Sequence, residues 1–125
     1  MRRLRRPTGP QRAAMRKVPA AGNYAISLNA LGRLEEVKSL LRKTMPVARR
    51  VFGESNEIML KMRWNYTMAL YMDPAATLDD LREAVTTLEE IERTARRVMG
   101  GAHPITTGIE VSLRNARRAL VRKHL

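Results

Sequence analysis

The sequence predicts an all-α fold made of repeated helical units, and two observations support this prediction. Apolar residues recur at helical spacing in the segments that follow Leu34, and no segment alternates with the period of two that strands require. In addition, the segment 34–53 aligns without a gap on the segment 81–100, and Ala-Arg-Arg-Val-x-Gly recurs at the same place in both. A chain of 125 residues suffices for one domain. We therefore expect a single all-α domain of about five helices.

Four of these helices follow from the apolar spacing and from residues that begin or end helices. Their expected bounds are 34–52, 56–72, 78–99 and 104–122. Gly53 ends the first of them, and Pro46 inside it removes a backbone hydrogen bond, so we expect a kink or a local break there. Thr77 followed by Asp80 resembles a capping box at the start of the third helix, and Pro104 suits the first turn of the last.

A fifth helix is expected to precede these four, because its sequence also repeats. Asn23-Tyr24-Ala25-Ile26 matches Asn65-Tyr66-Thr67-Met68, 42 residues further along, whereas the helices that follow are 47 residues apart. Five extra residues therefore lie in the loop 71–77. The first unit spans about 22–53 and the second about 56–100, and both lie in a repeat domain that covers 22–125 and ends with the terminal helix.

Residues 1–21 are expected to form a disordered basic lead, because they contain three prolines and a glycine and show no apolar periodicity. The first 34 residues hold eight basic side chains and no acidic one, whereas 16 basic and 12 acidic residues follow. Most of the net charge of +12 therefore belongs to the N-terminal part of the chain. A basic, acid-free start is also typical of mitochondrial presequences, which leaves a mitochondrial location as the alternative to a cytoplasmic one.

The residues that carry most enzyme chemistry are missing or badly placed. The sequence has no Cys, and His103 and His124 lack the spacing of paired metal ligands. Three pairs of carboxylates are adjacent in the sequence, Glu35–Glu36, Asp79–Asp80 and Glu89–Glu90, and adjacent residues point about 100° apart on a helix, which does not suit a shared acid–base site. No glycine-rich phosphate loop and no apolar run of membrane-spanning length is present. We expect no enzyme, no cofactor, no metal and no transmembrane segment, and the cytoplasm as the default location.

Several residues recur at positions that mark a known repeat. In the first unit they are Asn23-Tyr24-Ala25, Gly32, Leu34-Glu35-Glu36-Val37, Leu40-Leu41 and Phe52-Gly53. In the second unit they are Asn65-Tyr66, Leu81, Glu83-Ala84, Leu88, Met99-Gly100 and His103-Pro104. Over residues 22–120 the chain resembles tetratricopeptide (TPR) repeats, in the longer variety found in kinesin light chains. The resemblance implies a short solenoid of helical hairpins, which at this length is expected to self-associate or to be a fragment of a longer array.

The resemblance also implies that the first helices of the pairs line a concave groove that holds a peptide or a partner helix. The residues at groove-facing positions are Asn23, Asn29, Lys61, Trp64, Asn65, Met68, Asn115 and Arg118. An asparagine amide can pair with the main chain of an extended peptide, and Lys61 and Arg118 favour an acidic partner. The alternative for each residue is a solvated helix face, and for Trp64 it is packing in the core.

The chain is therefore predicted to be an adaptor or scaffold that binds another protein. A second hypothesis assigns it to nucleic acid or anionic membranes, through the basic lead and the terminal helix. That helix carries Arg114, Arg117, Arg118, Arg122 and Lys123. The lead contains no aromatic residue on which bases could stack, which weighs against single-stranded nucleic acid, and a protein partner is the favoured hypothesis.

Overall fold

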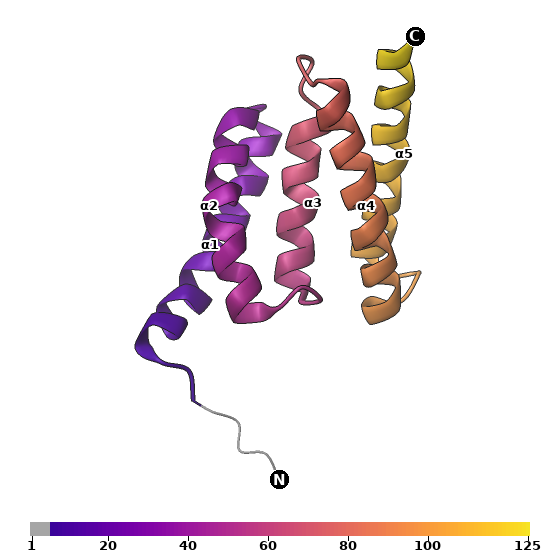
Figure 1. The fold of residues 1–125 in the computed structure, drawn as a ribbon. Coiled ribbons are helices and arrows are strands. Elements are labelled where there is room, and N and C mark those ends of the chain that lie inside the picture. The colour runs from indigo at the N-terminus through magenta and orange to yellow at the C-terminus, as the bar shows by residue number, and fades with distance from the viewer. Residues whose placement is uncertain (1–5) are drawn as a thin grey trace.

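Five helices and no strand make up the part of the chain that the computed structural model describes, residues 6–125 (Figure 1). They are α1 (Gly9–Ala30), α2 (Leu34–Phe52), α3 (Glu57–Tyr71), α4 (Leu78–Met99) and α5 (Pro104–His124). The prediction of an all-α fold is confirmed for these residues, and α2 to α5 begin and end within two residues of the predicted bounds. None of the described helices is long and apolar enough to cross a membrane.

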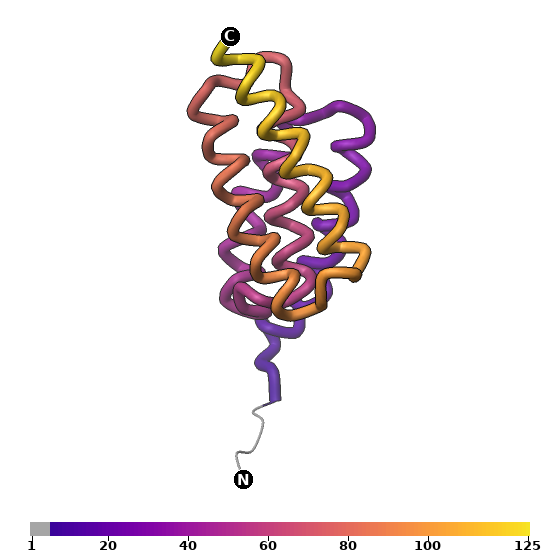
Figure 2. Tube along the Cα trace, turned by 90° about the vertical axis from the view of Figure 1, so that its right-hand side faces the viewer, coloured from indigo at the N-terminus to yellow at the C-terminus, as the bar shows by residue number. Residues whose placement is uncertain are grey.

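The helices lie side by side in two rows. Each helix packs on the one that follows it in the chain, and α3 is central because it contacts all four others. α1 and α5 both pack on α3, whereas α2 and α4 do not touch each other within residues 6–125. α1, α3 and α5 therefore form one row, and α2 and α4 form the second. Figure 2 shows this arrangement from the side of α4 and α5.

The core consists of two clusters that meet at α3. One cluster lies between α1, α2 and α3, and the other lies between α3, α4 and α5. Met59 and Met62 of α3 belong to the first cluster, whereas Leu60 and Leu70 belong to the second. A helix with neighbours on several sides needs apolar residues around most of its circumference, and α3 has them.

The helix ends follow local sequence signals. The capping box predicted at Thr77 is confirmed: the Thr77 N–H donates to Asp80 Oδ2 and the Asp80 N–H donates to Thr77 Oγ1, each at 3.1 Å. Pro104 occupies the first turn of α5, as predicted. Gly100 ends α4 with a φ of 92°, a conformation that side chains with a Cβ rarely adopt. Asn56, whose side chain accepts a hydrogen bond from the Ile58 N–H at 2.8 Å, caps α3.

The prediction of a disordered lead over 1–21 is wrong for residues 9–21, which belong to α1. Thr8 caps this helix, since its hydroxyl accepts from the Gln11 N–H and its own N–H donates to Gln11 Oε1 at 2.8 Å. Pro10 lies in the first turn, where a helix needs no N–H donor, and Val18 is buried. The first turns of α1 project beyond the other helices in Figure 1. Residues 1–5 of the predicted lead lie outside the described residues.

Pro46 does not break α2. The helix is continuous from Leu34 to Phe52, and Pro46 is exposed, so the missing N–H lies on the solvent side. Nearby, the Thr44 hydroxyl donates to the Leu40 carbonyl at 2.7 Å. Of the kink or local break expected there, the break is therefore absent.

The α3–α4 loop, residues 72–77, is three residues longer than the α1–α2 loop, residues 31–33, and α4 is three residues longer than α2, so the insertion expected in the loop 71–77 extends into the first turn of α4. An ion pair links this loop to α2. Lys38 Nζ lies 2.7 Å from Glu35 Oε1 and 3.4 Å from Asp73 Oδ2, and its side chain is only 9% exposed. The hydrogen bond to Glu35, together with Asp73, raises the pKa of Lys38 above its usual value. The pKa of Asp73 is lowered, first by the Ala75 N–H at 2.9 Å and then by Lys38.

Candidate functional site

A groove runs between α1 and α3 on the row formed by α1, α3 and α5. It consists of two adjoining pockets of about 150 Å³ and 310 Å³. Both pockets are lined by Ile26, Lys61 and Asn65, so they form one continuous depression, which we call the α1–α3 groove. The remaining lining residues are Pro19, Gly22, Asn23, Ile58, Met62, Trp64 and Met68.

Five of the eight residues predicted from the sequence line this groove: Asn23, Lys61, Trp64, Asn65 and Met68. Four of them belong to α3. Lys61, Asn65 and Met68 share one helix face because they are separated by four and then three residues. These three residues, which the resemblance to the repeat family suggested, form one wall of the groove.

Asn29 and Asn65 hold α1 and α3 together across the base of the groove. The Asn29 side-chain amide donates to the Asn65 carbonyl at 3.1 Å and to Asn65 Oδ1 at 3.3 Å. The Asn65 amide in turn donates to the Lys61 carbonyl at 2.9 Å. Both asparagines are 8% exposed, and Asn29 does not line either pocket. Their amide donors are thus engaged within the protein, and the predicted pairing with a peptide main chain would require these bonds to open.

Trp64 separates the groove from the core between α3 and α5. Its indole N–H donates to Ser112 Oγ at 2.7 Å, and its ring packs against Gly108. A Cβ added at Gly108 would lie 2.4 Å from the Trp64 ring, so only glycine leaves room for it. Trp64 therefore packs between α3 and α5 and also contributes one side of the larger pocket.

The structure separates Asn115 and Arg118 from the other predicted residues. Both are exposed on α5, and neither lines the groove. The reason is the rotation of α5, which meets Trp64 of α3 through Gly108 and Ser112. Arg118 lies about 120° around the helix from Ser112 and therefore points away from α3.

Ile26 is the main residue of the groove that sequence reasoning missed. It lines both pockets, and its side chain remains 47% exposed although it is large and apolar. Its position three residues after Asn23 on the same helix was the available signal. Its exposure, however, depends on how α1 is placed on α3, which the repeat pattern does not specify.

The groove lies on the more basic row of helices. α1, α3 and α5 together contain ten Lys or Arg and two Glu, whereas α2 and α4 contain nine Lys or Arg and eight Asp or Glu. Within the groove, Lys61 Nζ pairs with Glu57 Oε1 at 3.1 Å, and both side chains are about half exposed. Such an exposed pair contributes little stability, so Lys61 can exchange this carboxylate for one on a ligand.

No constellation for metal binding is present among residues 6–125, where no three His, Asp or Glu side chains converge. In comparisons with known proteins, the chain matches no protein-family model, no curated protein and no solved structure.

Proposed function

We propose that the chain is a protein-interaction module, built as a short tetratricopeptide-like array, that binds a peptide or a partner helix in the α1–α3 groove. The repeat of sequence between the two helix pairs supports this class of fold, as does the row formed by the first helix of each pair. The single observation that carries the functional proposal is the groove itself, in which an exposed isoleucine adjoins five residues predicted from the repeat pattern.

The chemistry of the groove suits an apolar side chain with a polar group beside it. Ile26, Ile58 and Met68 supply apolar walls, and a methionine side chain can adjust its shape to different ligands. Lys61 at the rim can pair with a carboxylate of the partner. From Ile58 to Met68 the groove follows α3 for about 15 Å, the length of roughly ten helical residues or five extended ones. A short recognition segment is therefore sufficient to fill it.

The test compares two substitutions that place a charge on equally exposed apolar residues. Ile26 in the groove and Val98 on α4 are both 47% exposed. Ile26→Glu should abolish the capture of specific partner proteins from cell extract, because it puts a carboxylate inside the apolar groove. Val98→Glu should leave the captured set unchanged. Quantitative mass spectrometry of the captured proteins measures the difference, and circular dichroism checks that both variants keep their helices. Identical protein sets for Ile26→Glu and the unmodified chain would exclude the groove as the binding site.

A further inference from the structure

The exposed side of α5 carries a row of three arginines. Arg114, Arg118 and Arg122 follow one another at intervals of four residues, which places them about 6 Å apart along the helix axis. All three are exposed. No Asp or Glu occurs between Val111 and the last residue of the chain, Leu125. The row is therefore a concentrated line of positive charge at the edge of the molecule.

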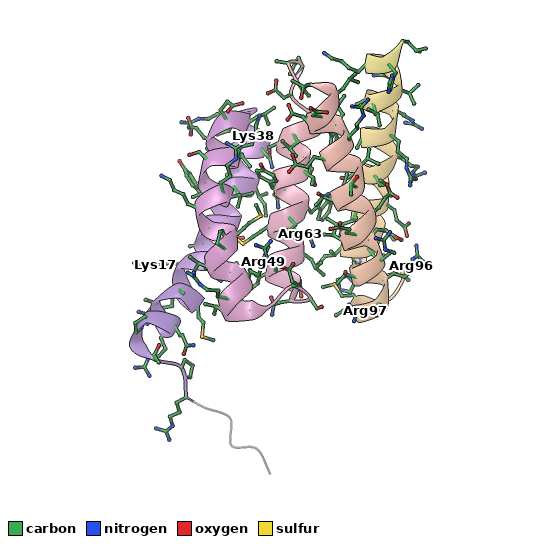
Figure 3. The ribbon with its side chains drawn as sticks, in the orientation of Figure 1. Lys17, Lys38, Arg49, Arg63, Arg96 and Arg97 are labelled. Atoms are coloured by element: carbon green, nitrogen blue, oxygen red, sulfur yellow. The ribbon has the colours of Figure 1, made fainter. Side chains whose placement is uncertain are left out.

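The two charged residues of α5 that face α4 are paired. Glu110 pairs with Arg96 of α4. The guanidinium group of Arg117 lies 4.0 Å from the carboxylate of Glu89, which also belongs to α4. Figure 3 shows Arg96 where α4 adjoins α5. The three arginines of the row, in contrast, form no ion pair with any residue in the described part of the chain.

Helix stability does not explain this arrangement. Like charges four residues apart repel each other, and the row contains two such pairs. The helix dipole favours cations in the last turn, which accounts for Arg122, but Arg114 and Arg118 lie one or more turns before it. The buried residues of α5 lie on the opposite side of the helix from Arg114 and Arg118, so packing does not require these two arginines, whereas Arg122 borders a depression between α5 and the α3–α4 loop.

We propose that this arginine row binds the sugar–phosphate backbone of a nucleic acid, with its arginines contacting successive phosphates. A guanidinium group forms two parallel hydrogen bonds to a phosphate, and regularly spaced guanidinium groups suit a polyanion with regularly spaced phosphates. The row has no aromatic side chain beside it for stacking on bases, so binding should be independent of sequence and sensitive to salt.

An anionic membrane is the less suitable occupant of this face. Stable binding at a membrane surface needs apolar side chains that insert between the lipids, in addition to basic ones. Apart from the terminal Leu125, the outer face of α5 offers only two exposed valines, Val111 and Val121. The only tryptophan, Trp64, packs between α3 and α5 and is not free to insert.

The experiment measures binding of a fluorescent oligonucleotide of about 20 nucleotides, single-stranded and as a duplex, by anisotropy between 50 and 200 mM salt. The test variant combines Arg114→Gln, Arg118→Gln and Arg122→Gln in the full chain. The matched control combines Lys43→Gln, Arg50→Gln and Arg97→Gln, which removes three exposed positive charges from α2 and α4. Circular dichroism confirms that both variants are folded.

The row variant should bind at least tenfold more weakly at low salt, and the slope of log affinity against log salt should fall by about two to three, because three phosphate-binding side chains have been removed. The control should bind less than threefold more weakly. Equal decreases in the two variants would overturn the proposal, because the attraction would then depend only on net charge. It would also be overturned if the row variant no longer bound phosphatidylserine vesicles but kept its binding to the oligonucleotides. Ile26→Glu should bind the oligonucleotides normally, so failure of the groove proposal is distinguishable from failure of this one.

Discussion

Replacement of Gly108 by alanine tests how closely α5 packs against α3. The new Cβ would lie 2.4 Å from Cη2 and 2.8 Å from Cζ2 of Trp64. Carbon atoms in contact prefer separations of about 3.5 to 4.0 Å, so the indole ring would have to move by about 1 Å. This movement would also stretch the hydrogen bond from the indole N–H to Ser112, which is 2.7 Å long.

The expected magnitude combines three contributions. Overpacking costs about 1 to 3 kcal/mol, and loss of a hydrogen bond costs about 1 kcal/mol. Alanine in place of glycine inside a helix stabilises the folded state by about 1 kcal/mol, because alanine has the higher helix propensity. Gly108→Ala should therefore lower the free energy of unfolding by about 2 kcal/mol, which corresponds to a decrease in Tm of about 7 °C for a chain of this size.

Thermal unfolding followed by circular dichroism measures the change in Tm, and the fluorescence of Trp64 reports the contact itself because the chain has no other tryptophan. Gly22→Ala is the control. Its Cβ would meet only Met62 Cγ, at 3.9 Å, so the helical preference of alanine should raise the stability by about 0.5 to 1 kcal/mol. In a Trp64→Leu background, Gly108→Ala should no longer be destabilising. A Gly108→Ala protein as stable as the unmodified chain would refute the packing argument.

Three further predictions concern local interactions. Thr77→Ala should destabilise the fold by about 1 kcal/mol, because it removes the cap of α4, and Thr77→Ser should restore that stability in urea unfolding. Asp73 has a lowered pKa in the folded state, so its carboxylate stabilises the fold above its unfolded pKa of about 3.9, and this contribution disappears as the pH falls through the folded value. Asp73→Asn should therefore be less stable than the unmodified chain near pH 6 and equally stable near pH 2, and a difference independent of pH would exclude this role. Asn29→Ala should cost about 2 kcal/mol, because it leaves the groups of Asn65 without a donor, and a change below about 0.5 kcal/mol would show that the pair contributes little.

The helices from α2 to α5 could be predicted because their signals are local. Thr77, Gly100 and Pro104 mark helix ends through their own backbone preferences, and apolar spacing defines the segments between them. The first half of α1 could not be predicted in this way. Its prolines indicate a loop, whereas the helix is stabilised by the cap at Thr8 and by burial of Val18, beside a pocket whose walls come from α1 and α2. Packing against a neighbouring helix overrode the local preference.

For the groove, too, the sequence predicts what local helix geometry fixes but not what depends on how the helices pack. Lys61, Asn65 and Met68 could be assigned to one face because helix geometry fixes their directions. Which residues lie opposite them depends on how α1 and α5 are rotated and positioned against α3, and a repeat pattern does not define this. Ile26 was therefore missed, and Arg118 was grouped with residues that it does not approach.

The net charge of residues 35–125 does not reveal how basic the terminal helix is, although the sequence places five basic residues in it. Beyond residue 34 the basic and acidic residues nearly balance along the chain, which is typical of an ordinary mixed surface. This balance arises because two neighbouring helices carry net charges of opposite sign. α4 holds six of the twelve acidic residues, whereas α5 holds five basic residues and one Glu. Where the two helices meet, their opposite charges pair, as Glu110 does with Arg96. Arg114 and Arg118 of α5 remain exposed and, within residues 6–125, unpaired, so one side of this helix is strongly basic although residues 35–125 together hold only four more basic than acidic residues.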